Sequence, residues 1–198
     1  MNKENPKLSQ HSDEELIKRF QEGDLYAFDL IVHRYKDALF NFTYRYLGNS
    51  QEAEDVVQET FLRIFRNRFA YRQIAKFSTW IYTIAGNLAK TELRKRKRRR
   101  QVYTSDMGFD DKEFEIVDTK ADTEREVDSM LTEKLIQAAI DKLPERFRKV
   151  ILLVDVQELS YEEVSKIMRV PLGTVKSRVN RARLKLQGML QELFDAQR

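Results

Sequence analysis

The sequence contains no cysteine, and only six glycines, three prolines and two histidines occur among its 198 residues. Without cysteine the chain can form neither disulfide bonds nor thiolate metal sites, which fits a cytosolic protein without requiring one. The two histidines, His11 and His33, stand alone rather than in a cluster with metal-ligand spacing. We therefore interpret both as surface or interface residues, and we expect no metal and no other cofactor.

Long apolar runs are missing as well. No stretch approaches the ~20 apolar residues that a membrane-spanning helix needs, and the polar N-terminus lacks a secretory segment. The chain shows no nucleophile–base pair and no glycine-rich phosphate loop, so we expect a non-catalytic cytoplasmic protein without membrane insertion. The scarcity of glycine and proline, beside 41% hydrophobic and 34% charged residues, favours an all-α fold.

Charge is distributed unevenly along the chain, although the net charge is only +4. Residues 94–100 are all Lys or Arg, and the segment that follows is rich in Asp and Glu as far as Asp128. Blocks of this kind are typical of linkers and interacting tails rather than of a core. We therefore predict two small helical domains joined by an acidic flexible linker. The expected ranges are 1–11 for an N-terminal tail, 12–100 for the first domain, 101–128 for the linker and 129–198 for the second domain.

The first domain is expected to hold four helices, because apolar residues recur at helical spacing between recognisable caps. Ser12 and Glu15 have the pattern of a capping box, and Gly48 ends the second helix. We expect the third helix over about residues 51–66 and the fourth over about 78–98. The residues expected on the inner face of the third helix are Ala53, Val56, Val57, Thr60, Phe61, Ile64 and Phe65.

The second domain contains the most informative segment, residues 160–186, which has the pattern of two short helices joined by a tight turn. It follows two further expected helices, one ending at Leu143 and one over 145–156. Pro171 suits the entry to the last helix. The apolar residues of this helix recur at helical spacing, and its other positions are polar or basic. Such a helix, held against a preceding one, is suited to a DNA major groove. The alternative is an ordinary helical hairpin with solvated cations.

An acidic and amide cluster lies on the third expected helix. Asp55 and Glu59 are four residues apart and share a face, with Gln58 adjacent. Like charges at this spacing repel, so the cluster suggests a cationic partner; a solvated face is the alternative.

The start of the fourth expected helix mixes the only tryptophan, Trp80, with other aromatic, hydroxyl and amide residues, and a run of cations follows. Aromatic rings beside basic residues suit unstacked bases of melted nucleic acid. The alternative is that Trp80, Ile81, Ile84 and Leu88 are simply the core face, and we favour it for these residues. The side chains that we expect to point outward are Tyr71, Thr79, Thr83, Asn87 and Lys90. The basic block that begins at Arg94 is expected to neutralise phosphates.

Together these segments resemble bacterial sigma factors of the extracytoplasmic-function group. The resemblance runs from about Asp13 to Leu190. Its strongest parts are Leu47-Gly48-Asn49 with Glu54-Asp55-Val56-Val57-Gln58-Glu59-Thr60-Phe61, Phe77-Ser78-Thr79-Trp80-Ile81 with Ile84-Ala85-Gly86-Asn87, Leu143-Pro144-Glu145, and Leu159-Ser160-Tyr161-Glu162-Glu163 with Pro171-Leu172-Gly173-Thr174-Val175-Lys176-Ser177-Arg178.

The resemblance implies a sigma region 2-like domain and a sigma region 4-like helix-turn-helix domain. It implies that the first domain docks on the clamp helices of the β′ subunit of core RNA polymerase, through Asp55, Gln58 and Glu59. It also implies the β flap as a contact, and the acidic linker as a segment threaded toward the RNA exit path. The residues implied at the melted −10 element are Tyr71, Thr79, Trp80, Thr83, Asn87, Lys90 and Arg94, with a flipped base near Tyr71 and Asn87. Those implied at the −35 duplex are Gly173, Thr174, Lys176, Ser177, Arg178, Asn180 and Arg181.

Two residues depart from the family pattern. Gly86 stands where an Arg often precedes the Asn, and Arg169 stands in the turn where Gly is common. Family analogy also suggests control by an anti-sigma factor. The competing hypothesis is a dimeric helix-turn-helix regulator that does not join polymerase. The acidic cluster and the aromatic segment argue against it, because a regulator needs neither.

Overall fold

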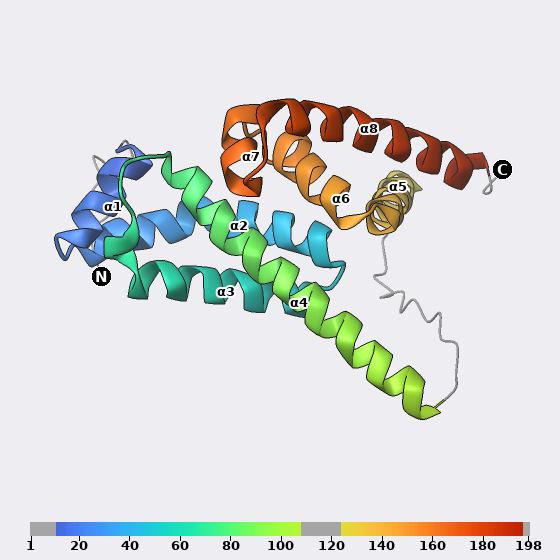
Figure 1. Cartoon of the computed structure of the whole chain (residues 1–198), viewed down its shortest axis with the longest axis horizontal. Coiled ribbons are helices and arrows are strands. Elements are labelled where there is room, and N and C mark those ends of the chain that lie inside the picture. Colours follow the sequence, from blue (N-terminus) through green and yellow to red (C-terminus); the bar gives the residue numbers. More distant parts are fainter. Residues whose placement is uncertain (1–10, 108–123, 196–198) are drawn as a thin grey trace.

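The computed structural model describes residues 11–107 and 124–195, and within these two ranges the chain forms helices and no strand (Figure 1). The expected all-α fold is thereby confirmed. The elements of the first domain are α1 (Asp13–Gln21), α2 (Leu25–Leu47), α3 (Ser50–Arg66), the short 3₁₀ turn η2 (Arg68–Ala70) and α4 (Phe77–Met107). Those of the second are α5 (Glu124–Lys142), α6 (Glu145–Ile151), the π-helical turn η3 (Leu152–Val156), α7 (Tyr161–Met168) and α8 (Leu172–Asp195).

Local caps set the ends of the first helices as the sequence predicts. Ser12 and Glu15 form a reciprocal capping box at α1. The Asp24 side chain accepts hydrogen bonds from two backbone N–H groups at the start of α2. Gly48 ends α2 with φ 68°, a left-handed conformation that glycine adopts without the steric cost of a Cβ. A side-chain cap at a helix N-terminus, such as Ser12 or Asp24, stabilises its helix by about 1 kcal/mol.

Several element boundaries differ from the prediction. Helix α4 continues to Met107, beyond the expected end near residue 98, and α5 begins at Glu124, before residue 129. Lys and Arg are good helix formers, so a run of solvated cations does not by itself end a helix. The second-domain helix expected over 145–156 changes to a π-helical turn after Ile151. Residues 1–10 of the predicted tail and 108–123 of the predicted linker lie outside the described residues.

The core of the first domain forms where α1, α3 and α4 pack around α2 (Figure 1). Leu16, Phe20, Ile31 and Phe42 are almost completely buried there. Phe65, which we expected on the inner face of α3, is 40% exposed. It lies in the last turn of α3, where one part of its ring meets Phe20 and Phe28 and the rest stays open.

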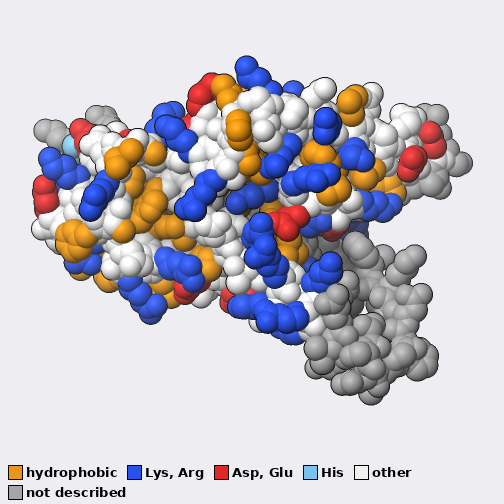
Figure 2. All heavy atoms as spheres, in the orientation of Figure 1, with side chains coloured by type: hydrophobic (Ala, Val, Ile, Leu, Met, Phe, Trp, Pro, Cys, Tyr) orange, Lys and Arg blue, Asp and Glu red, His pale blue; other side chains and the backbone are white. Residues whose placement is uncertain are grey.

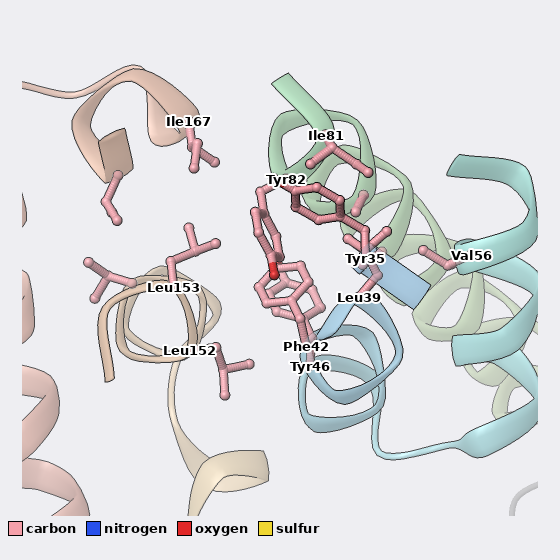
Figure 3. Packing of buried hydrophobic residues seen from close by; sticks show 14 of the residues in the cluster. Tyr35, Leu39, Phe42, Tyr46, Val56, Ile81, Tyr82, Leu152, Leu153 and Ile167 are labelled. Atoms are coloured by element: carbon pink, nitrogen blue, oxygen red, sulfur yellow. The ribbon is translucent and has the colours of Figure 1, made fainter. Parts of the chain in front are cut away.

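The two domains pack against each other through a continuous apolar junction. Helix α4 contacts α7, and α2 contacts both α5 and η3. Leu152 and Leu153 face Tyr82 and Phe42 across this junction (Figure 3), and all four side chains are buried. Burial of apolar surface stabilises a packed arrangement of the two domains by about 25 cal/mol per Å². We call this packed arrangement the closed arrangement. It brings α4 of the first domain beside the helix-turn-helix of the second.

Candidate nucleic-acid interface

Helices α7 and α8 form the expected helix-turn-helix. Ser160 and Glu163 make a capping box at the start of α7. Arg169 ends this helix with φ 54° and ψ 49°, the left-handed conformation required by the tight turn. The Ser165 hydroxyl donates a hydrogen bond of 2.6 Å to the carbonyl oxygen of Val170 and fixes the turn from inside. The buried anchoring residues of α7 and α8 are Val164, Ile167, Val175, Val179 and Ala182.

The opposite face of α8 carries the polar residues predicted to meet DNA. Lys176, Ser177, Asn180 and Arg181 are exposed. Gly173 is exposed near the helix start, whereas Thr174 and Arg178 are partly buried. A helix with one anchored face and one open cationic face can enter a major groove. The structure thus brings the predicted −35 residues together on one element.

Arg183 lies on the same helix but has a structural partner. Its guanidinium donates two hydrogen bonds, of 2.6 and 3.0 Å, to the two carboxylate oxygens of Asp155. These bonds raise the pKa of Arg183 above its ordinary value. Arg183 therefore links α8 to η3.

Tyr71 does not point outward as predicted. It is 7% exposed, and its ring packs against Phe77 and Trp80. Its hydroxyl donates a 2.8 Å hydrogen bond to the carbonyl oxygen of Ala75, and burial raises its pKa to about 12. The expectation of an exposed ring is wrong for this arrangement, because the segment before α4 folds this tyrosine inward as part of the core.

Thr79 was also expected outside, and it is 5% exposed. Its hydroxyl has no hydrogen-bond partner among the described residues. The adjacent Ser78 hydroxyl donates a 2.9 Å hydrogen bond to Glu163 of α7, and the Tyr82 hydroxyl donates one to Gln157. Because this face of α4 meets the second domain, the prediction for Thr79 is wrong in the closed arrangement.

The other predicted −10 residues differ in exposure. Trp80 and Thr83 are partly buried, and the Thr83 hydroxyl donates a 2.6 Å hydrogen bond to the carbonyl oxygen of Thr79. Asn87 and Arg94 are exposed. Lys90 forms a 3.3 Å ion pair with Glu145 of α6.

Sequence reasoning missed one residue of the loop before α4. Ile74 is 84% exposed, between the exposed residues Gln73 and Lys76 and the partly buried Ala75. An apolar side chain in a polar loop is a weak signal in a sequence, since single exposed apolar residues are common. Its near-complete exposure at the entrance to α4 makes it a candidate for contact with an unstacked base.

The acidic and amide cluster lies on an open face of α3, as predicted. Asp55 and Gln58 are exposed, and Glu59 accepts a 2.8 Å hydrogen bond from Arg63. Leu62, which follows Gln58 and Glu59 at helical spacing, is 47% exposed and adds an apolar group to this face. Leu62 was not among the residues predicted for this face.

Gly86 has a structural explanation. A Cβ built on this residue would lie 2.7 Å from Nζ and 2.8 Å from Cε of Lys149 on α6. The Lys149 side chain therefore occupies the space beside α4 into which an Arg at position 86 would project. This departure from the family pattern coincides with a contact between the two domains, Lys149 of α6 against α4.

No helix in 11–107 or 124–195 is long and apolar enough to cross a membrane. In the same residues, no group of three or more His, Asp or Glu side chains is placed to hold a metal ion.

Comparisons with known proteins match the two domains separately and together. The family model of Sigma-70 region 2 matches residues 31–99, and that of Sigma-70 region 4 matches residues 133–186. The RNA polymerase sigma-H factor of Pseudomonas aeruginosa is 37% identical, covering 94% of this chain and 98% of the relative. The ECF RNA polymerase sigma factor SigW of Bacillus subtilis is 39% identical, covering 89% and 96%.

Solved structures resemble the chain over both domains. The sigma factor RpoE of Bartonella quintana, in complex with the anti-sigma factor NepR, has a TM-score of 0.65 and 27% identity, covering 83% of this chain and 96% of that one. CnrH in complex with the cytosolic domain of CnrY has a TM-score of 0.70 at 21% identity, covering 92% and 99%, which shows a shared fold.

Proposed function

Because this chain belongs to the extracytoplasmic-function (ECF) group of the sigma-70 family, we propose that it joins core RNA polymerase in the cytoplasm and directs it to promoters through the surfaces described above. One observation carries the proposal. A single chain presents an open cationic face on a helix-turn-helix and an open acidic face on α3. The first suits DNA and the second suits a basic protein surface.

The second domain reads the −35 duplex. The exposed side chains of Lys176, Asn180 and Arg181 reach base edges or phosphates when α8 lies in the major groove. Gly173 and Thr174 lie in the first turn of α8, where unpaired backbone N–H groups favour a phosphate.

The first domain holds the melted −10 element. Asn87 and Arg94 on α4 and Ile74 in the preceding loop are the exposed groups that support this role. Thr79 is 5% exposed, and its neighbours Ser78 and Tyr82 bond to the second domain, so we infer that Thr79 becomes available when the second domain moves away from α4. The proposal therefore includes an opening of the two domains before the −10 element binds.

The face of α3 that carries Asp55, Gln58 and Glu59 docks on the clamp helices of the β′ subunit, and the second domain contacts the β flap. Leu62 adds apolar area at the edge of the α3 face. Protein interfaces combine apolar and polar groups, and this face offers both.

An anti-sigma factor is the proposed regulator. The RpoE structure that resembles this chain over both domains was solved with the anti-sigma factor NepR. An inhibitor that prefers the closed arrangement would keep the −10 face of α4 covered, because a ligand shifts a population toward the state it binds better.

The deciding experiment is in vitro transcription with sigma-free core RNA polymerase on a pooled promoter library, followed by sequencing of the RNA 5′ ends. Defined start sites preceded by shared −35 and −10 sequences are expected. Absence of transcripts, together with binding of the protein alone to a palindromic duplex, would favour a dimeric regulator. A reaction with the Asp55→Arg variant serves as the control for polymerase docking.

A further inference from the structure

A cleft of about 680 Å³ lies at the junction of the two domains. Its walls come from α4, from α6 with the preceding Pro144, from the end of α7 and from α8. In Figure 2, Lys and Arg side chains gather over the middle of the molecule, where α4 meets the second domain. The cleft exists only in the closed arrangement, because neither domain supplies all of its walls.

Cationic side chains dominate the lining. The five that line the cleft are Lys90, Arg146, Lys149, Arg169 and Arg178, and Glu145 is the one carboxylate among the lining residues. Glu145 is already engaged in an ion pair of 3.3 Å with Lys90. Like charges brought together in a partly desolvated space repel, so the closed arrangement carries an unfavourable electrostatic contribution here.

Lys149 is the most enclosed of these cations. It is 8% exposed, and its ammonium group has neither a hydrogen-bond acceptor nor an ion-pair partner among the described residues. Burial, and then repulsion by Lys90, lower its pKa to about 8. Glu145, which is paired with Lys90, is the one carboxylate that acts on this ammonium group and compensates its charge only in part. A cation in such a partly desolvated site is unfavourable unless further negative charge comes near it. The position of Lys149 in the wall of the cleft therefore points to an anion inside.

We propose that this cleft binds a compact polyphosphate anion, inorganic or carried by a nucleotide, and that the anion stabilises the closed arrangement of the two domains. Arg146, Arg169 and Arg178 come from three different elements and converge on one space. A guanidinium binds a phosphate or a carboxylate with two parallel hydrogen bonds. Three guanidiniums that converge on one space favour a ligand with several negative oxygens close together, which a polyphosphate has and a single carboxylate lacks.

The size of the cleft supports a small ligand. A volume of about 680 Å³ falls within the range of small-molecule sites. A protein partner would instead need a contact surface, and a stable protein interface buries more than about 1,000 Å² of it. Pro144, Ile167 and Met168 give part of the wall an apolar character. That part can accept a ring, such as a nucleobase, beside the phosphates.

Binding of the anion opposes promoter recognition. Asn87 and Lys90 belong to the predicted −10 set and Arg178 to the −35 set, yet all three line the cleft. An anion held between them occupies groups that DNA phosphates would need and keeps α4 against the second domain. This consequence rests on the proposed function, whereas the binding site itself does not.

The test is isothermal titration of the full chain with sodium tripolyphosphate at fixed ionic strength, compared with the variants Lys149→Met and Lys36→Met. Lys36 is an exposed cation on α2 outside the cleft, so its variant controls for the loss of one charge. Lys149→Met is expected to weaken binding roughly tenfold, as for the loss of one charge-assisted contact, and Lys36→Met to leave it unchanged. Arg146→Gln should also bind more weakly. Because Arg146 is exposed, this variant is expected to fold normally, so it tests the cleft even if Lys149→Met misfolds.

Equal affinity for tripolyphosphate in the wild type, Lys149→Met, Lys36→Met and Arg146→Gln would overturn the proposal. Binding would then depend on the overall charge of the protein and not on the cations of the cleft. Tighter binding of ATP or GTP than of tripolyphosphate assigns the ligand to a nucleotide, and equal binding assigns it to the phosphate chain. Lys149-dependent binding of polyglutamate, tighter than that of tripolyphosphate, would overturn it in favour of an acidic peptide. No polymerase or promoter enters this assay, so its failure is separable from a failure of the sigma-factor proposal.

Discussion

Arg169 holds a backbone conformation that glycine adopts more readily, with φ 54° in the turn between α7 and α8. A Cβ in this region costs roughly 1 kcal/mol. Arg169→Gly is therefore expected to raise the free energy of unfolding by about 0.5–1 kcal/mol in urea titrations. Arg169→Ala removes the same charge but keeps the Cβ, so it should give little of this gain. An equal gain in both variants would assign the effect to charge rather than to backbone strain.

Arg181 and Lys176 provide the residue-scale test of duplex reading. Each is exposed on α8 and belongs to no ion pair within the described residues. Replacement by Ala should weaken binding to a −35 duplex by about 1–3 kcal/mol where the contact is to a base, measured by fluorescence anisotropy. Lys36→Ala, on the first domain, is the matched control and should bind normally. Wild-type affinity in both α8 variants would remove these residues from the recognition face.

Individual residues show where sequence reasoning reaches its limit. The capping boxes at Ser12 and Ser160 are local, so the sequence predicts them correctly. Tyr71 was misplaced because an irregular segment without helical periodicity folds its ring onto Phe77 and Trp80. Thr79 was misplaced because its face of α4 meets a distant part of the chain. Ser78, next to Thr79, bonds to Glu163, a residue 85 positions later. Helical spacing reports which residues share a face, and it does not report which other element will cover that face.

The helix α3 is the element on which polymerase docking depends. Asp55→Arg reverses a charge at the centre of its open acidic face, where a basic partner would be repelled. The variant is expected to lose association with core polymerase in a pull-down while its helical circular dichroism stays normal. Asp37→Arg makes the same reversal at an exposed position of α2 and should associate normally. An Asp55→Arg protein that binds like the wild type would exclude Asp55 from the interface.

The packing of α6 against α4 makes stability depend on pH through Lys149. Its pKa is lowered to about 8, because burial and Lys90 disfavour the charged form, while the pKa of an unperturbed lysine is 10.5. Between these values the unfolded chain binds more protons than the folded one, so the free energy of unfolding rises with pH. The cost of the charged form is fully present below pH 8. The charged groups that line the same cleft as Lys149 are Lys90, Glu145, Arg146, Arg169 and Arg178.

We expect the free energy of unfolding to increase by on the order of 1–2 kcal/mol between about pH 7.5 and pH 9.5 through Lys149. Burial raises the pKa of Tyr82 and other core tyrosines, which lowers stability only above about pH 10. Urea titrations at the two pH values measure the difference. Lys149→Met should abolish the increase and Lys36→Met should retain it. An increase that persists in Lys149→Met would belong to another group.

At the scale of the element, the sequence predicted the helices well and their mutual arrangement poorly. Apolar spacing and caps place α1, α2 and α3 within a few residues. The end of α4 was missed because a basic block is compatible with a solvated helix. The closed junction, in which Leu153 faces Tyr82, depends on contacts about 70 residues apart and leaves no local pattern (Figure 3).

The whole molecule combines two requirements that oppose each other. The apolar junction and the contacts of Ser78 and Tyr82 favour closure. The crowded cations of the cleft, and the burial of Thr79 of the predicted −10 set, favour opening once DNA is present. A balance of this kind can be shifted by a few kcal/mol, which is the scale of one binding event or one substitution.

Gly86 offers the sharpest test of this balance. An Arg side chain at this position would meet Nζ of Lys149, which lies 2.7 Å from the site of the new Cβ, and would add a cation beside Lys149 and Lys90. Steric overlap and repulsion act in the same direction, so Gly86→Arg is expected to shift the population toward the open form about tenfold. Promoter affinity should rise with it.

The distance between the domains is the direct measurement. The chain has no cysteine, so Lys36→Cys on α2 and Glu192→Cys on α8 would carry the only two fluorescent labels. Gly86→Arg should lower energy transfer between them. Gly188→Arg adds the same side chain within α8, where nothing lies within 4 Å of the new Cβ, and should leave the transfer unchanged. If Gly86→Arg also leaves the energy transfer unchanged, the Lys149 side chain has moved aside while the junction stayed closed. The contact at Gly86 would then not control closure.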